Sequence, residues 1–134
     1  MQEMIHQTAI ISEKAVIGQN VRIGAYCVIG DKVNLADNVT LHSHVVIDGN
    51  TSVGENCEVF PFAALGLAPQ HTRYDGEDSQ LIIGKNNVMR EYVTFHPGTA
   101  VGHMKTAIGD GNLFYVGSHI AHDCILGDNV IAAN

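Results

Sequence analysis

Tryptophan is absent from this chain of 134 residues, and aromatic residues make up only 6% of it although 46% of the residues are hydrophobic. A core of large rings is therefore excluded, and the apolar side chains must fill a narrow interior as Ile, Leu, Val and Ala. No apolar stretch approaches the roughly 20 residues of a membrane-spanning helix. We therefore expect no integral membrane segment.

Basic residues are also scarce, because seven Lys and Arg stand against fourteen Asp and Glu and give a formal net charge of −7. Nucleic-acid binding needs clustered positive charge, so a nucleic-acid partner is disfavoured. The cysteines Cys27, Cys57 and Cys124 form no CxxC pair, and the first seven residues lack the features of a signal peptide. We expect core thiols in the reducing cytoplasm, without a bound metal or cofactor.

The chain does contain an internal repeat, in which an aliphatic residue returns at every sixth position and a small or β-branched residue follows four positions later. Eleven such positions in a row would arise by chance in roughly one sequence in a million. The aliphatic positions are Ile5, Ile11, Ile17, Ile23, Ile29, Leu35, Leu41, Ile47, Val53, Val59 and Leu65.

Each hexapeptide predicts a short strand with two inward side chains, because side chains alternate between the faces of a strand. Gly, Asn and Asp, which tolerate positive φ, follow at the corners. Three hexapeptides make one coil, and coils stack at about 4.8 Å. The sequence therefore predicts an all-β fold, a parallel β-helix with the shape of a triangular prism, as one domain over residues 1–134.

Two segments interrupt the repeat, at about residues 66–80 and 100–106. Neither has an inward column, so we expect both to leave the prism as loops, where binding residues often lie. The column resumes at Ile83 and continues, shifted by one residue, from Ile108. It stops at Asn134 in the middle of a hexapeptide without a cap, so we expect a fragment that is truncated at its C-terminus.

None of the eight histidines falls in an inward column, so all should face outward or lie in loops. His119 and His122 share one short stretch with Asp123, and His96 should lie a little over one coil earlier. Clustered outward imidazoles can bind a metal or perform acid–base chemistry, although each could also be a solvated surface residue. A prism with flat sides also associates readily as a symmetric homotrimer.

Three motifs extend beyond the repeat: the stretch from Ser118 to Cys124, Gly84 to Glu91 with Val93-Thr94, and the Pro69–Glu77 segment. On these motifs the chain resembles the hexapeptide-repeat acyltransferases, and among them the UDP-N-acetylglucosamine 3-O-acyltransferases that begin lipid A synthesis. The resemblance runs from about Ile5 to the last residue. It implies a left-handed coil, which physics alone would not predict because parallel crossovers are nearly always right-handed.

The resemblance also implies partners and a larger protein. These are a homotrimer with active sites between subunits, a UDP-sugar substrate, and acyl carrier protein as the acyl donor. The C-terminal part, with further coils and a helical domain that helps bind the carrier, would be absent here. The amide that binds the oxyanion and the residues that measure the acyl chain should lie beyond Asn134, so we expect this chain alone to be inactive.

The same resemblance assigns roles to individual residues. His122 is the general base that takes the proton from the sugar 3-hydroxyl as this oxygen attacks the acyl thioester, and Asp123 orients it. His96, His119 and Gln70 line the nucleotide-sugar site.

Two positions depart from the family pattern. Arg73 stands where Lys is usual, which keeps the charge but changes the hydrogen-bond geometry. His71 stands where Asp is usual, near the acceptor. This leaves open whether the acceptor is a 3-hydroxyl or the 3-amino group of an analogue.

Three other functions stay open at this point. A sibling enzyme could transfer an acyl or acetyl group to an amino group of a nucleotide sugar. A trimeric β-helix metalloenzyme of the carbonic anhydrase type could use His119 and His122 as ligands. A repeat scaffold without catalysis would leave the histidines as surface residues.

Overall fold

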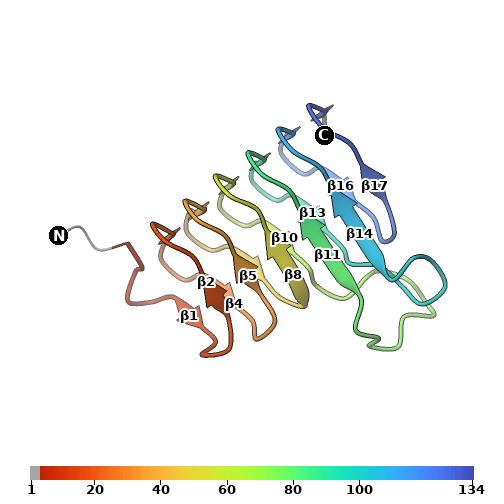
Figure 1. Cartoon of the computed structure of the whole chain (residues 1–134), viewed down its shortest axis with the longest axis horizontal. Helices are drawn as coiled ribbons and strands as arrows, with labels where there is room; N and C mark the ends of the chain where they lie inside the picture. The colour runs from red at the N-terminus through yellow and green to blue at the C-terminus, as the bar shows by residue number, and fades with distance from the viewer. Residues whose placement is uncertain (1–3) are drawn as a thin grey trace.

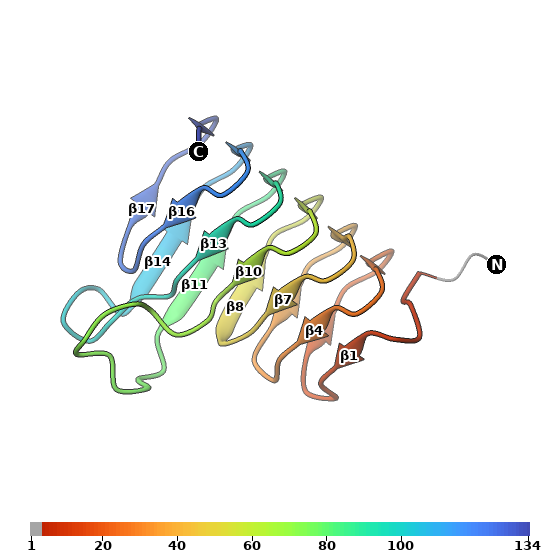
Figure 2. The same ribbon diagram turned by 180° about the vertical axis from the view of Figure 1, so that it is seen from behind.

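The computed structural model describes residues 4–134 and contains within them eighteen β-strands and no helix. The strands form three parallel sheets of six strands, and each strand pairs with the strand three positions along the chain (Figures 1 and 2). Three strands thus complete one coil, and the coil winds left-handed. The predicted parallel β-helix and the left-handed coil are confirmed.

The three sheets are the flat sides of the prism. The first contains β1 (Ile10–Ile11), β4 (Val28–Ile29), β7 (Val46–Ile47), β10 (Ala64–Leu65), β13 (Thr94–Phe95) and β16 (His119–Ile120). The second contains β2 (Val16–Ile17), β5 (Asn34–Leu35), β8 (Asn50–Val53), β11 (Gln80–Ile83), β14 (Lys105–Ile108) and β17 (Ile125–Leu126). The third contains β3 (Arg22–Ile23), β6 (Thr40–Leu41), β9 (Glu58–Val59), β12 (Val88–Met89), β15 (Leu113–Phe114) and β18 (Ile131–Ala132).

The aliphatic column lies inside the prism, as the repeat predicts. Parallel register stacks Ile11 on Ile29 and Ile29 on Ile47, while the first residue of each strand points outward. Larger rings enter the same column further along, where Phe95 and Phe114 are fully buried and pack edge to face with their centroids 4.8 Å apart.

The companion inward slot holds asparagine at two positions of the later coils. Asn87 and Asn112 are buried, yet each has its amide satisfied. Asn87 Nδ2 donates to the carbonyl of Gly109 at 2.8 Å and its Oδ1 accepts from the amide of Asn112 at 2.8 Å, while Asn112 repeats the pattern with Gly127 and Val130. Because buried polar groups are costly only when unpaired, these amides fit the core.

One corner of the prism carries rings where the sequence predicts Gly, Asn or Asp. Tyr26, His44, Phe62 and Tyr92 all adopt positive φ there, and their rings stack from coil to coil with centroids 5.2, 5.1 and 5.3 Å apart. Stacking between coils offsets the strain that positive φ imposes on bulky residues. The repeat alone gives no sign of this column.

Both interruptions of the repeat are loops that leave the same edge of the prism (Figures 1 and 2). The first covers residues 66–79. The second ends at residue 104 and not at 106, because Lys105 and Thr106 already pair with β11 in β14. Gly98 permits the close return of this loop, since a Cβ there would lie 1.9 Å from the amide nitrogen of Lys105.

The cysteines correct one expectation. Cys27 and Cys57 are buried, and burial raises the pKa of both thiols. Cys124 occupies the inward column but is exposed, because no further coil stacks on its own coil in this chain. Within residues 4–134 no helix is long and apolar enough to cross a membrane.

Candidate active site

His122 and Asp123 lie at the corner between β16 and β17. Asp123 adopts a φ of 66° there, and its amide donates to the side-chain oxygen of Thr106 at 2.9 Å. This geometry turns the two side chains toward each other, so that Nδ1 of His122 lies 2.8 Å from Oδ2 of Asp123. The corner therefore forms an imidazole–carboxylate pair on the outside of the prism.

The carboxylate of Asp123 is held by further donors from the second loop. The amide and the hydroxyl of Thr99 donate to it at 2.9 and 2.6 Å, and the amide of His103 donates at 2.8 Å. Burial would raise the pKa of Asp123, but the hydrogen bonds from Thr99, His122 and His103 outweigh it and hold the pKa far below its usual range. An ionised carboxylate can only accept, so Nδ1 of His122 carries a proton, and in the neutral ring the lone pair is on Nε2.

His71 lies against the same imidazole from the first loop. The ring centroids of His71 and His122 are 4.9 Å apart, and the planes meet edge to face at 83°. The amide of Arg73 donates to Nδ1 of His71 at 3.1 Å. The structure thus brings together two imidazoles that are far apart in the sequence.

A second imidazole pair lies on the neighbouring part of the first sheet. His96 directly follows β13, and His119 lies in β16 opposite Thr94, so their ring centroids are 4.7 Å apart. Nδ1 of His119 lies 2.8 Å from the Thr94 hydroxyl and 3.1 Å from its carbonyl oxygen. Burial lowers the pKa of His96, and the neighbouring His119 and His122 lower it further.

Gln70 joins the first loop to this second pair. Its main-chain amide donates to Nδ1 of His96 at 3.4 Å, and its side-chain Nε2 lies 3.4 Å from Nε2 of His119. Arg73 is also a predicted site residue. It contacts His71 through its main-chain amide, and its side chain is exposed. All eight histidines are exposed or half-buried, which confirms that none is internal.

The sequence pattern missed the residues that hold the two loops in place. Thr99 is fully buried beneath Asp123. Glu77 accepts from the amide of Ala100 at 2.7 Å and from the amide of Asp75 at 2.8 Å, so it ties the first loop to the second. Both hydrogen bonds lower the pKa of Glu77, and the bond from Ala100 has the larger effect. No periodic signal marks either residue, because both lie outside the repeat.

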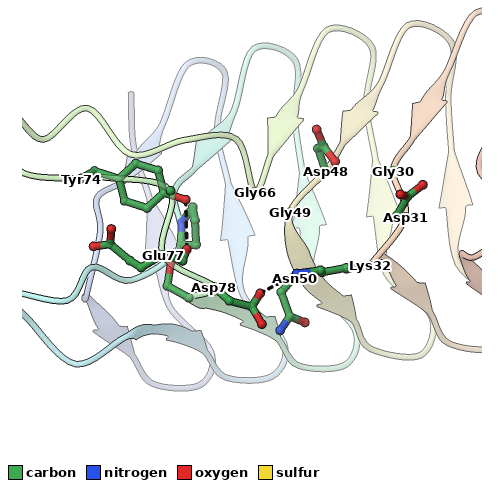
Figure 3. Close-up of a pocket in the computed structure, with 13 residues that line it drawn as sticks. Gly30, Asp31, Lys32, Asp48, Gly49, Asn50, Gly66, Tyr74, Glu77 and Asp78 are labelled. Atoms are coloured by element: carbon green, nitrogen blue, oxygen red, sulfur yellow. Dashed lines mark hydrogen bonds and ion pairs between the residues drawn. The ribbon is translucent and has the colours of Figure 1, made fainter.

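A cavity of about 440 Å³ lies between the first loop and the corners that hold Gly30 and Gly49 (Figure 3). Tyr74, Glu77 and Asp78 line its loop side, and Asp78 pairs with Lys32 at 3.0 Å across it. None of the predicted site residues lines this cavity. His96 and His119 lie instead on the outside of the first sheet, and His71 and His122 lie at the corner that follows it.

Metal binding has no candidate among the described residues, since no group of three or more His, Cys, Asp or Glu side chains within residues 4–134 is arranged to hold an ion. Two of the ring nitrogens that a metal could use are already bonded. Nδ1 of His122 faces Asp123, and Nδ1 of His119 faces Thr94.

Comparison with known proteins places the chain in a class. Residues 14–49 match the family model described as bacterial transferase hexapeptide, with six repeats. The coil geometry and this match agree, and the chain contains the hexapeptide repeat that this model of bacterial transferases describes.

Beyond the residues of this match, the chain is similar to several enzymes that share one name. It is 49% identical over 97% of its length to the acyl-[acyl-carrier-protein]–UDP-N-acetylglucosamine O-acyltransferase of Thermodesulfovibrio yellowstonii, covering 50% of that protein. It is 53% identical over 64% of its length to the enzyme of the same name from Helicobacter pylori, covering 32% of that protein. The structure of LpxA from Acinetobacter baumannii matches 98% of the chain with a TM-score of 0.97 and 48% identity, and the chain covers 51% of it. The chain thus spans about half the length of the relatives it matches, or less.

Replacing Asp123 by Asn is expected to lower the stability at neutral pH by about 1–3 kcal/mol, because an amide NH₂ would face the donors of Thr99 and His103. The folded-state pKa of Asp123 lies below the unfolded value of about 3.9. Its stabilisation is therefore present above that value and is lost as the pH falls through the folded pKa. Urea unfolding of both proteins should show a difference that shrinks below about pH 4; a difference that is constant from pH 7 to pH 3 would contradict this explanation.

Proposed function

We propose that the protein transfers a 3-hydroxyacyl group from acyl carrier protein to the 3-hydroxyl of UDP-N-acetylglucosamine, the first step of lipid A biosynthesis. The observation that supports this most is the pair of His122 and Asp123, which leaves Nε2 of an outward imidazole with a lone pair. The names of the relatives support the substrates. The same relatives support the enzyme class, an acyltransferase.

In this reaction His122 acts as the general base. Nε2 takes the proton of the 3-hydroxyl as the oxygen forms a bond to the thioester carbonyl carbon. The carbon–sulfur bond then breaks, and the leaving thiolate takes the proton back from His122, so that an ester and a thiol result. Asp123 keeps the ring in the required tautomer and stabilises the imidazolium ion that forms in between.

The remaining residues bind the nucleotide sugar. His96 and His119 present their outer edges on one face, and Gln70 fixes both rings from the loop above them. Arg73 is exposed on the same loop as Gln70 and would attract the diphosphate. Side chains on loops over a rigid sheet suit this task, because the sheet fixes their spacing.

The protein is further proposed to act as a homotrimer in the cytoplasm. The imidazole pairs lie on an open outer face of the prism, so a neighbouring subunit would complete a cleft there. Further coils and a helical domain beyond residue 134 would supply the oxyanion-binding amide, the pocket for the acyl chain and the surface for acyl carrier protein.

The test is a transfer assay with the full-length protein, a 3-hydroxyacyl carrier protein and UDP-N-acetylglucosamine, followed by mass spectrometry of the nucleotide sugar. The expected product carries one acyl group in ester linkage at the 3-position. Sedimentation of the same sample should give the mass of three chains. Loss of thioester without an acylated nucleotide sugar would contradict the proposal.

A further inference from the structure

We propose that Thr99 is a positioning residue that acts through Asp123: its hydroxyl shares the carboxylate oxygen that faces His122, and so keeps this imidazole uncharged and able to accept a proton at neutral pH. This inference rests on the proposed acyl transfer and deepens it, because it names the group that sets the charge of the proposed base. Thr99 lies in the second loop, and within residues 4–134 its side chain bonds to Asp123 alone.

The hydrogen bonds of the Asp123 carboxylate divide between its two oxygens. Oδ1 accepts from the main-chain amides of Thr99 and His103, at 2.9 and 2.8 Å. Oδ2 accepts from the Thr99 hydroxyl at 2.6 Å and lies 2.8 Å from Nδ1 of His122. The two amides therefore fix the position of the carboxylate, whereas the hydroxyl and the imidazole share one oxygen.

The Thr99 hydroxyl is held in place by its surroundings. The residue is fully buried, and its carbonyl accepts from the amides of Gly102 and Met104 at 3.1 and 3.0 Å. A β-branched side chain has few rotamers. Because an ionised carboxylate can only accept, the hydroxyl must donate its proton to Oδ2, and no solvent reaches it to compete.

Sharing this oxygen matters because little water reaches the carboxylate. The side chain of Asp123 is 11% exposed, and opposite charges attract more strongly where water is excluded. An unshared Oδ2 would stabilise the imidazolium form of His122, which has no lone pair to take a further proton. A donor on the same oxygen takes up part of its negative charge and weakens this attraction.

The pair of His42 and Glu58 provides an internal comparison. Nε2 of His42 lies 2.8 Å from Oε2 of Glu58, the same separation as between His122 and Asp123. Within residues 4–134 the Glu58 side chain has no other hydrogen bond, but it is 41% exposed. Water can therefore share the carboxylate of Glu58. At the shielded pair the Thr99 hydroxyl takes the place of that water.

The experiment measures kcat/KM of the full-length protein between about pH 5 and pH 9, where a histidine base gains and loses its proton. Thr99→Val keeps the shape and removes the hydroxyl, whereas Thr99→Ser keeps the hydroxyl. The rate rises with pH as the base loses its proton. In Thr99→Val this rise should move upward by about 0.5–1 in pH, because a more negative Oδ2 stabilises the imidazolium ion.

On the rising part of the profile, Thr99→Val should therefore be about three- to tenfold slower than the wild type at the same pH. Its limiting rate at high pH should stay within about tenfold of the wild type, because Oδ1 keeps both main-chain donors. Thr99→Ser should follow the wild-type profile. The other ionisable side chains near the imidazole are His71 of the first loop and His96 after β13, and neither is changed.

Thr106→Val is the matched control. Thr106 is also fully buried, but its hydroxyl oxygen accepts from the main-chain amide of Asp123 and does not contact the carboxylate. Its loss should lower the stability without moving the pH profile. Equal displacement in Thr106→Val and Thr99→Val would indicate a general disturbance of the corner and overturn the inference. An unmoved or downward profile in Thr99→Val also overturns it and leaves the transferase function standing.

A second measurement is independent of activity. The ¹⁵N spectrum of the imidazoles, recorded against pH in the full-length protein without substrates, follows the charge of His122 directly. In Thr99→Val, and in Thr99→Ala if valine disturbs the loop, the ring should stay charged to higher pH than in the wild type. The same titration in all proteins overturns the role of Thr99. A wild type that transfers no acyl group while Thr99→Val shows this displacement overturns the proposed transfer alone.

Discussion

Replacing His122 by Ala in the full-length protein is expected to reduce acyl transfer by a factor of about 10²–10⁴, which is the usual contribution of a positioned general base. The fold should be retained. The side chain lies on the outside of the prism and keeps 29% of its surface exposed, so little packing is lost. Steady-state rates with the carrier thioester measure the effect.

His6→Ala is the matched control for this change. It removes another outward imidazole, which is exposed just before the first strand, β1, and it should leave the rate unchanged. Unfolding curves that coincide for the wild type and both variants would show that the loss is catalytic. A rate for His122→Ala within about tenfold of the wild type would rule out this residue as the base.

Replacing Phe95 by Ala is expected to lower the free energy of unfolding by about 3–5 kcal/mol. The ring is fully buried, packs edge to face on Phe114 and lies directly before His96 in the chain. The substitution therefore leaves a cavity in the core beneath the second imidazole pair. Denaturant unfolding of the full-length protein, followed by circular dichroism, measures the shift of the midpoint.

Tyr92→Ala provides the matched control, since it also reduces an aromatic ring to a methyl group three positions earlier. That ring is 59% exposed at the stacked corner, so its loss should cost less than about 1 kcal/mol. Similar losses for both variants would mean that the interior of the prism can collapse around the missing ring, contrary to the expectation for a core of stacked coils.

The sequence predicts the coil because the repeat leaves few alternatives. A column such as Ile29, Leu35 and Leu41 can be buried only if the chain turns after every hexapeptide. The pair of His122 and Asp123 does not follow from the repeat, which only keeps both residues out of the inward column. The family resemblance implied it. Handedness is different, because the preference for right-handed crossovers gives the wrong answer and only the family resemblance gave the right one.

The loops could not be predicted in this way. The contact of His71 with His122, and the positions of Thr99 and Glu77, depend on hydrogen bonds between two segments without any repeat. No period relates such segments to the prism. The stacked corner rings were also missed, because the rule that favours Gly, Asn and Asp at positive φ considers one residue at a time, whereas Phe62 at this corner stacks on His44 and Tyr92.

Asn87 and Asn112 have a consequence for how accurately the histidines are positioned. Where the interior is purely aliphatic, one coil can shift in register on the next at little cost, since one methyl group resembles another. An amide that must meet a particular carbonyl, as Asn112 meets Gly127, does not. If the later coils shifted by a single residue, these amide groups would lose their partners, at a cost of roughly 1–3 kcal/mol each. The interior thus sets the height of His119 and His122 relative to the loop that carries Gln70 and His71.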